Sequence, residues 1–167
     1  MARLKAEAGQ GLVELVVAMF VLTVALLALA AGYETAAAKL AASQIELYQS
    51  LKVSQIGLDQ TTLTNTQTSG NGAYNATYVS DEASLTPSGT DHTISSCGSS
   101  PQCLPVQDVT WSDAHHYRIE TFIRDVVNTG ASSTWNERYV TVMVRDLGVS
   151  GYPLLFSATT AFDPGPS

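Results

Sequence analysis

Residues 9–20 read GQGLVELVVAMF, and the run continues without a charge as VLTVALLALAA to residue 31. From residue 12 the apolar stretch is 20 residues long, which as an α-helix measures about 30 Å, the thickness of a bilayer's hydrocarbon core. Glu14 is the one acidic residue in it. Because a carboxylate in hydrocarbon is costly unless a cation pairs with it, the stretch predicts a membrane helix whose first turn requires a positive partner.

Two basic residues, Arg3 and Lys5, precede the apolar stretch. Positive charges stay on the cytoplasmic side of a membrane span, so we expect the chain beyond residue 31 to lie outside the cytoplasm. Two simpler interpretations remain open. The stretch could be a secretory signal peptide cut near the small residues 28–31, or a plain single-pass anchor. Neither of these interpretations requires Glu14.

The same residues resemble the leader and helix of type IV pilins and pseudopilins. In that family a prepilin peptidase cuts after a glycine, and the mature chain carries glutamate at its fifth position. Counting back from Glu14 places the cut between Gly9 and Gln10. The resemblance implies a leader peptide over residues 1–9, N-methylation of Gln10, and pairing of Glu14 with the N-terminal ammonium of a neighbouring subunit. The implied partners are other pilin subunits, the prepilin peptidase and, before assembly, the cytoplasmic membrane.

The sequence departs from major pilins in two respects. Its mature chain would start with Gln10 and Gly11 instead of phenylalanine and threonine, and its apolar helix has no proline, only Gly32 as a weak point. In addition, QIELYQSLKVSQIGLD at residues 44–59 resembles the segment that closes the long helix in minor pilins of the PilV kind and in pseudopilin I of type II secretion. The resemblance therefore implies a minor pilin or pseudopilin, located in a surface pilus or in a periplasmic or cell-wall pseudopilus.

Beyond the apolar stretch, strong helix formers without proline predict that the helix continues to about Leu58. We expect residues 10–32 to form the transmembrane or filament-core part and residues 33–59 an amphipathic part that enters the head. Ile45 and Ile56 are expected to face adjacent subunits. At 100° per residue, one stripe gathers the side chains that we expect to pack on a sheet, with Tyr48 at its edge: Tyr33, Leu40, Leu47, Leu51 and Leu58.

The remaining chain predicts a small β-rich head. Residues 60–112 are rich in Thr, Ser, Asn and Gly, which favours a variable, irregular loop with one short strand at residues 74–79. Within residues 113–167 the apolar residues alternate, so we expect strands at 116–127, 138–146 and 153–162. Short links favour an antiparallel meander with one face on the helix and the other toward solvent. The expected fold class is α+β, a long N-terminal helix on an antiparallel sheet of three to four strands, in the manner of a pilin.

Cys97 and Cys103 lie in the polar segment SSCGSSPQCLP. Because the predicted orientation places this segment outside the cytoplasm, a disulfide that closes a small loop is favoured over two free thiols. A redox or metal role is disfavoured, because the spacing is not that of a CxxC motif.

Metal binding is not indicated elsewhere. His115 and His116 are adjacent on a predicted strand and would point to opposite faces. Several acidic residues lack the regular spacing of a calcium-binding loop and are expected to be solvated loop residues: Asp81, Glu82, Asp108 and Asp113.

Enzymatic and nucleic-acid functions are also not indicated. The sequence has no nucleophile elbow, phosphate loop or zinc signature, so we expect neither an enzyme nor a cofactor. The net charge is −7 with only 8 scattered Lys and Arg residues, which argues against nucleic-acid binding by the subunit. Asn75 begins a glycosylation sequon. The competing hypothesis is a monomeric membrane-anchored or secreted β-domain that binds a ligand without polymerising.

Overall fold

The protein has an α+β fold with a long N-terminal helix and an antiparallel sheet. The chain divides into two compact units, Met1–Ala36 and Ala37–Ser167. Helix α1 covers Arg3–Gln49, 47 residues and about 70 Å. The structure, a computed structural model, describes residues 3–68, 73–95, 97, 100–112, 114–129 and 134–163, without the side chains of 3–13, 30, 73–75, 90, 128–129 and 134–135.

The helix ends nine residues before the position that the sequence predicted. The backbone amide of Leu51 donates to the carbonyl of Tyr48 at 3.0 Å, which closes the last turn. A short 3-10 helix, η1 (Val53–Gln55), and strand β1 (Leu58–Asp59) follow. The extension to Leu58 was therefore wrong. In the extended backbone both Ile56 and Leu58 become fully buried in the head, and this burial outweighs the local helix propensity of the segment.

Two helices occupy the region that the sequence predicted to be irregular. Helix α2 covers Gln60–Gln67 and helix α3 covers Ala73–Ser84. The Asp59 carboxylate caps α2, because it accepts a hydrogen bond from the Thr62 amide at 2.9 Å. The strand expected at residues 74–79 was wrong, since these residues lie inside α3.

Short elements connect these helices to the sheet. Strands β2 (Thr90–Asp91) and β3 (Thr93–Ile94) are followed by the 3-10 helix η2 (Pro101–Cys103) and by strand β4 (Val106–Thr110). Strand β3 pairs in parallel with β1 and forms a separate two-stranded sheet.

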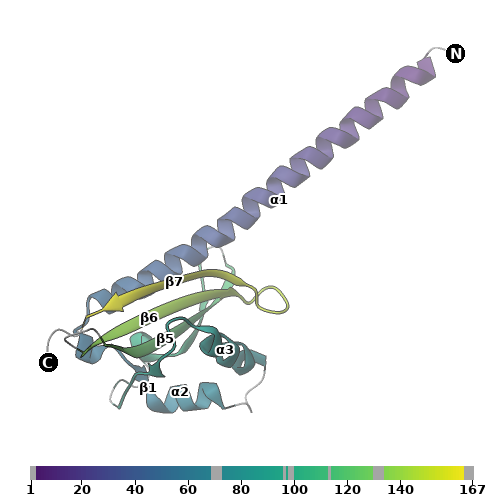
Figure 1. Cartoon of the computed structure of the whole chain (residues 1–167). Coiled ribbons are helices and arrows are strands. Elements are labelled where there is room, and N and C mark those ends of the chain that lie inside the picture. Colours follow the sequence, from purple (N-terminus) through teal and green to yellow (C-terminus); the bar gives the residue numbers. More distant parts are fainter. Residues whose placement is uncertain are drawn as a thin grey trace. The chain divides into compact units, whose positions relative to one another are not determined.

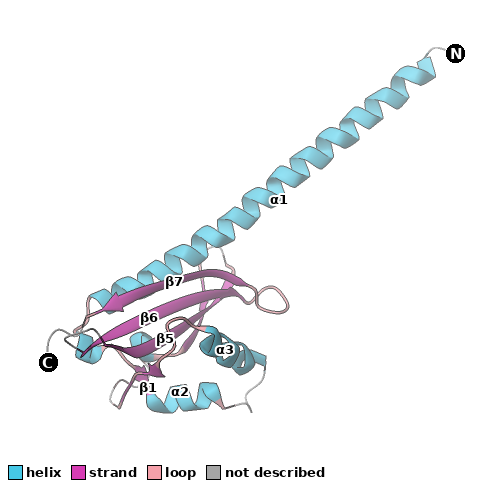
Figure 2. Cartoon of the chain, in the orientation of Figure 1, coloured by secondary structure: helices cyan, strands magenta, loops and turns pink. Residues whose placement is uncertain are grey.

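The main sheet is antiparallel and contains the three strands that the alternating pattern predicted. They are β5 (His116–Thr129), β6 (Thr134–Asp146) and β7 (Leu154–Phe162), which lie side by side in that order (Figure 1). Strands β2 and β4 both pair with β5 on its other edge and bring the sheet to five strands. Figure 2 shows helices α2 and α3 in cyan and the strands of the sheet in magenta.

Both faces of this sheet are covered, although the sequence predicted one solvent face. Thr121 and Phe122 are neighbours on β5 and therefore point to opposite faces. The phenol of Tyr48 of α1 lies near the Thr121 side chain on one face. On the other face the ring of Tyr78 from α3 stacks on Phe122, with ring centroids 4.5 Å apart. The sheet thus lies between the last turns of α1 and helix α3.

Candidate functional site

The apolar segment of α1 is the part of the described chain whose surface departs most from that of a water-soluble protein. Its large apolar side chains, between Leu15 and Leu29, are 49% to 70% exposed. Helix residues Glu14–Gln49 include a window with mean hydropathy 2.7 and no buried residue, long and apolar enough to cross a membrane. A buried core helix would not show this exposure. The segment therefore requires a cover of lipid or protein that the described chain does not supply.

Glu14 is the first residue of this segment whose side chain is described, and it is exposed on α1. The backbone of Gly9 and Gln10 is helical within α1, while their side chains lie outside the described part. The cut between them, the methylation of Gln10 and the pairing of Glu14 with an ammonium group remain predictions.

The stripe expected to pack on the sheet is buried unevenly. Leu40 and Leu58 are buried, whereas Tyr33, Leu47 and Leu51 are half-buried. Leu58 contributes from β1 and Leu51 from the bend after α1, not from a continued helix.

The face of α1 that is buried in the head is rotated from the predicted stripe. It consists of residues at helical spacing: Ala37, Leu40, Ala41, Gln44 and Tyr48. The prediction missed Gln44 because its side chain is polar, although the small and large residues beside it follow the helical period. Tyr48 donates a hydrogen bond to the carbonyl of Gln102 at 2.7 Å, and burial raises the pKa of its phenol to about 12.

The two isoleucines expected to face neighbouring subunits differ in the structure. Ile45 is half-buried and lines an apolar groove of about 330 Å³ beside Phe156 and Ala158 of β7. Ile56 is fully buried in the head. For Ile56 the expectation was wrong, because it lies after the end of α1.

The disulfide expected between Cys97 and Cys103 is present, with the two Cα atoms 5.9 Å apart. Cys103 is fully buried at the end of η2. The loop that the disulfide closes carries the Gln102 carbonyl to which Tyr48 donates. The covalent bond therefore helps to hold a contact of α1 in place.

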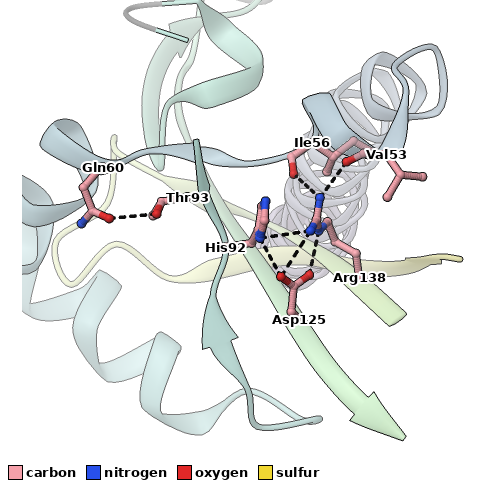
Figure 3. Close-up of polar contacts among 7 residues, drawn as sticks. All are labelled: Val53, Ile56, Gln60, His92, Thr93, Asp125 and Arg138. Atoms are coloured by element: carbon pink, nitrogen blue, oxygen red, sulfur yellow. Dashed lines mark hydrogen bonds and ion pairs between the residues drawn. The ribbon is translucent and has the colours of Figure 1, made fainter. Parts of the chain in front are cut away.

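A polar clamp fixes the chain that follows α1 (Figure 3). Arg138 on β6 donates to the carbonyls of Val53 and Ile56 at 2.6 and 2.9 Å. Its Nε atom also donates to Asp125 at 2.7 Å, and Asp125 lies 2.6 Å from His92 Nδ1. Burial opposes ionisation of Asp125, but the hydrogen bond and charge of Arg138, with His92, outweigh it and lower the pKa of this carboxyl.

A hollow of about 620 Å³ opens beside this clamp. His92 contributes to its wall. The other lining groups are mostly uncharged and polar, with two aliphatic side chains among them: Leu51, Ser54, Gln55, Thr93, Ile94, Ser95, Cys97, Ser100 and Gln102. Hydroxyl and amide groups of this kind suit an uncharged ligand of small size.

The histidines and acidic residues considered for metal binding are engaged elsewhere. His115 Nε2 lies 2.6 Å from Asp146 Oδ1, and His116 Nδ1 lies 3.0 Å from the Thr110 hydroxyl on β4. Among the described residues no group of three His, Cys, Asp or Glu side chains could hold a metal.

The acidic residues expected to be solvated differ from one another. Asp81 and Glu82 lie on α3 and face buried arginines of the sheet, so for these two the expectation was wrong. Asp108 is exposed and pairs with Arg118 at 2.9 Å, and Asp113 lies outside the described residues.

The chain was compared with protein families, curated proteins and solved structures. No protein-family model, no curated protein and no solved structure matches the chain.

Proposed function

We propose that this chain is a pilin-like structural subunit of a type IV pilus or related filament, cut after Gly9 and assembled through α1. The observation that supports this function is the exposed apolar segment that begins at Glu14. The second unit has its own buried core, formed by β5, β6 and the last turns of α1. The first unit therefore provides a surface for lipid before assembly and for other subunits afterwards.

The charge of Glu14 is the electrostatic part of this proposal. A carboxylate in a water-free bundle is stable only beside a cation. The cut would place a free ammonium group on Gln10, four residues before Glu14, at the same end of the apolar segment. When a subunit joins the bundle, the position of lowest free energy is the one in which its ammonium meets the Glu14 carboxylate of a neighbour. The pair thereby sets how far each subunit slides along the filament axis.

The test compares two glutamates of the same helix. Glu14→Ala should still enter the membrane and be cut after Gly9, but should be recovered from sheared filaments about tenfold less than the unchanged chain, which corresponds to about 1.4 kcal/mol. The matched control is Glu34→Ala, because Glu34 is also exposed on α1 but lies beyond the apolar segment. N-terminal sequencing of the membrane fraction reports the cut separately from assembly.

Two results would contradict the proposal at different steps. A mature chain that starts anywhere other than Gln10 would refute the processing step. Normal filament recovery of Glu14→Ala would refute the electrostatic role while leaving the cut intact.

A second candidate function is that of a membrane-anchored β-domain that binds a small ligand. The hollow beside His92 favours it, because its lining offers hydroxyl and amide groups around two aliphatic side chains. The two functions separate on polymerisation. An anchored binding domain would keep the residues before Gln10 and remain monomeric after extraction in detergent, whereas the pilin-like subunit would lose them and appear in sheared filaments.

A further inference from the structure

Helix α3 is attached to the sheet through a face that carries many charges. At its centre Tyr78 is fully buried, stacks on Phe122 and donates to the carbonyl of Thr121 at 3.2 Å. Among the described residues, nine charged side chains share this face, six carboxyl and three guanidinium groups: Asp81 and Glu82 on α3, Asp91 on β2, Asp108 on β4, Glu120, Arg118 and Arg124 on β5, and Glu137 and Arg145 on β6. At its far end Tyr139 and Glu137 bond each other at 2.6 Å.

The first group of charges contains one guanidinium and two carboxyl groups. Arg145 Nε lies 3.0 Å from Glu120 Oε2, and the same guanidinium pairs with Asp81 and donates to the carbonyl of Tyr152 at 2.8 Å. Glu120 is 0% exposed, and its Oε1 atom has no hydrogen-bond partner among the described residues. A second negative charge here would be buried without a cation, which is strongly unfavourable. A proton on Glu120, shared with Asp81, removes this second negative charge.

The second group repeats this imbalance at the next residue of α3, Glu82. The Gln67 amide donates to Glu82 at 2.7 Å and to Asp91 at 3.0 Å, so it holds the two carboxyl groups side by side. Arg124 lies 3.6 Å from Asp91 Oδ1 and donates to the backbone carbonyl of Glu82 at 2.5 Å. Again one guanidinium faces two carboxyl groups. A single proton shared by Glu82 and Asp91 balances the charge.

The third ion pair on this face does not supply a cation to the other two groups. Arg118 is bound by Asp108 at 2.9 and 3.3 Å and lies directly opposite Arg145 on the neighbouring strand. We infer that two shared protons, one between Asp81 and Glu120 and one between Glu82 and Asp91, latch α3 to the sheet, and that α3 loosens when these protons are lost.

The pKa values of the two glutamates set the pH range in which α3 loosens. Burial, and then the neighbouring Asp81, raises the pKa of Glu120 to about 7. Burial, and then Asp91, raises the pKa of Glu82 to about 7 as well. In an unfolded chain each carboxyl titrates near 4.5. The folded state therefore holds more protons between these values, so the stabilisation is complete below about pH 4.5, falls as the pH rises through 7, and is absent above about pH 8.

The experiment uses the full chain in detergent micelles. We expect Tm to fall by about 5–10 °C between pH 5.5 and pH 8.5. Hydrogen exchange, corrected for the intrinsic pH dependence of the rates, should show at least a tenfold loss of protection in peptides from α3 with little change in β6. His92 and His115 contact Asp125 and Asp146 outside this face, and His116 is exposed beside Thr110 on β4. Exchange in peptides around these histidines is therefore followed separately from exchange in α3.

Two substitutions replace the titrating carboxyl group by a neutral amide of the same shape. Glu120→Gln and Glu82→Gln should each flatten about half of the pH dependence of Tm, and the double variant should flatten most of it. Glu46→Gln, at an exposed position of α1, is the matched control and should keep the full dependence. A pH-independent Tm in the unchanged chain would overturn the latch, as would a double variant with an unaltered dependence. If the variants do not fold, the exchange data on the unchanged chain decide: uniform loss over both α3 and β6 contradicts it.

Discussion

The apolar segment of α1 and the α3 face of the sheet invert the usual distribution of side chains. Leu22 in the first is 61% exposed, whereas Glu120 in the second is 0% exposed. Exposure of apolar surface is unfavourable in water, and burial of charge is unfavourable away from it. The charged side chains of the sheet have ionic partners inside the chain, on α3, β2 and β4. The apolar segment has no covering partner within the described chain. The difference indicates that the charged face is complete within the chain, whereas the apolar segment depends on other molecules.

The strongest test of this comparison removes the cation from the buried face. Arg145→Ala leaves Asp81 and Glu120 without their guanidinium, and we expect it to lower the free energy of unfolding by about 3–5 kcal/mol. Urea denaturation in detergent measures the loss. Lys39→Ala, at an exposed position of α1, is the control. An equally small effect of both substitutions would mean that the buried face is not the self-sufficient region proposed above.

A charge placed in the apolar segment should act on the membrane instead of the fold. Leu22→Arg lies near the middle of the apolar stretch, where an arginine opposes insertion by about 3 kcal/mol. We expect insertion to fall strongly and the unfolding of residues 37–167 to remain unchanged. Val127→Arg is the matched control, because Val127 on β5 is 63% exposed, close to the 61% of Leu22. If both variants insert normally, the segment is not a membrane helix.

The smallest expected effect concerns the contact between α1 and the disulfide loop. Tyr48→Phe removes the hydroxyl that donates to the Gln102 carbonyl, so we expect a loss of about 1 kcal/mol of unfolding free energy. Tyr139→Phe removes a half-buried hydroxyl that bonds the neighbouring Glu137 side chain and should have a smaller effect. Thermal unfolding of both variants makes the comparison. A reversed order would show that the end of α1 is weakly attached to the head.

Local sequence patterns predicted the elements whose cause is local. The apolar stretch predicted a helix, and the alternation in residues 113–167 predicted β5, β6 and β7. The pattern failed in residues 60–84, where Thr- and Asn-rich helices have low intrinsic propensity. Among their described side chains, the large ones that are buried are Leu63 in α2 and Tyr78 in α3. The Asp59 cap was a usable signal for the start of α2.

The candidate site divides in the same way. Glu14 stands out in the sequence because its neighbours are apolar, and the Cys97–Cys103 bridge follows from short spacing and the predicted compartment. The role of Gln44 and the clamp of His92, Asp125 and Arg138 did not follow from the sequence. The contacts that form them join residues 13 to 85 positions apart along the chain.

The sequence by itself determined that a long apolar helix precedes an alternating β-region, because hydropathy and side-chain period are properties of neighbouring residues. Only the tertiary structure decided that the charged side of β5 is buried. Its alternation of Arg118, Glu120 and Arg124 is that of a solvent face until α3 covers it with Asp81 and Glu82. Whether a charged strand face meets water or a helix depends on contacts between distant segments, and no local pattern encodes them.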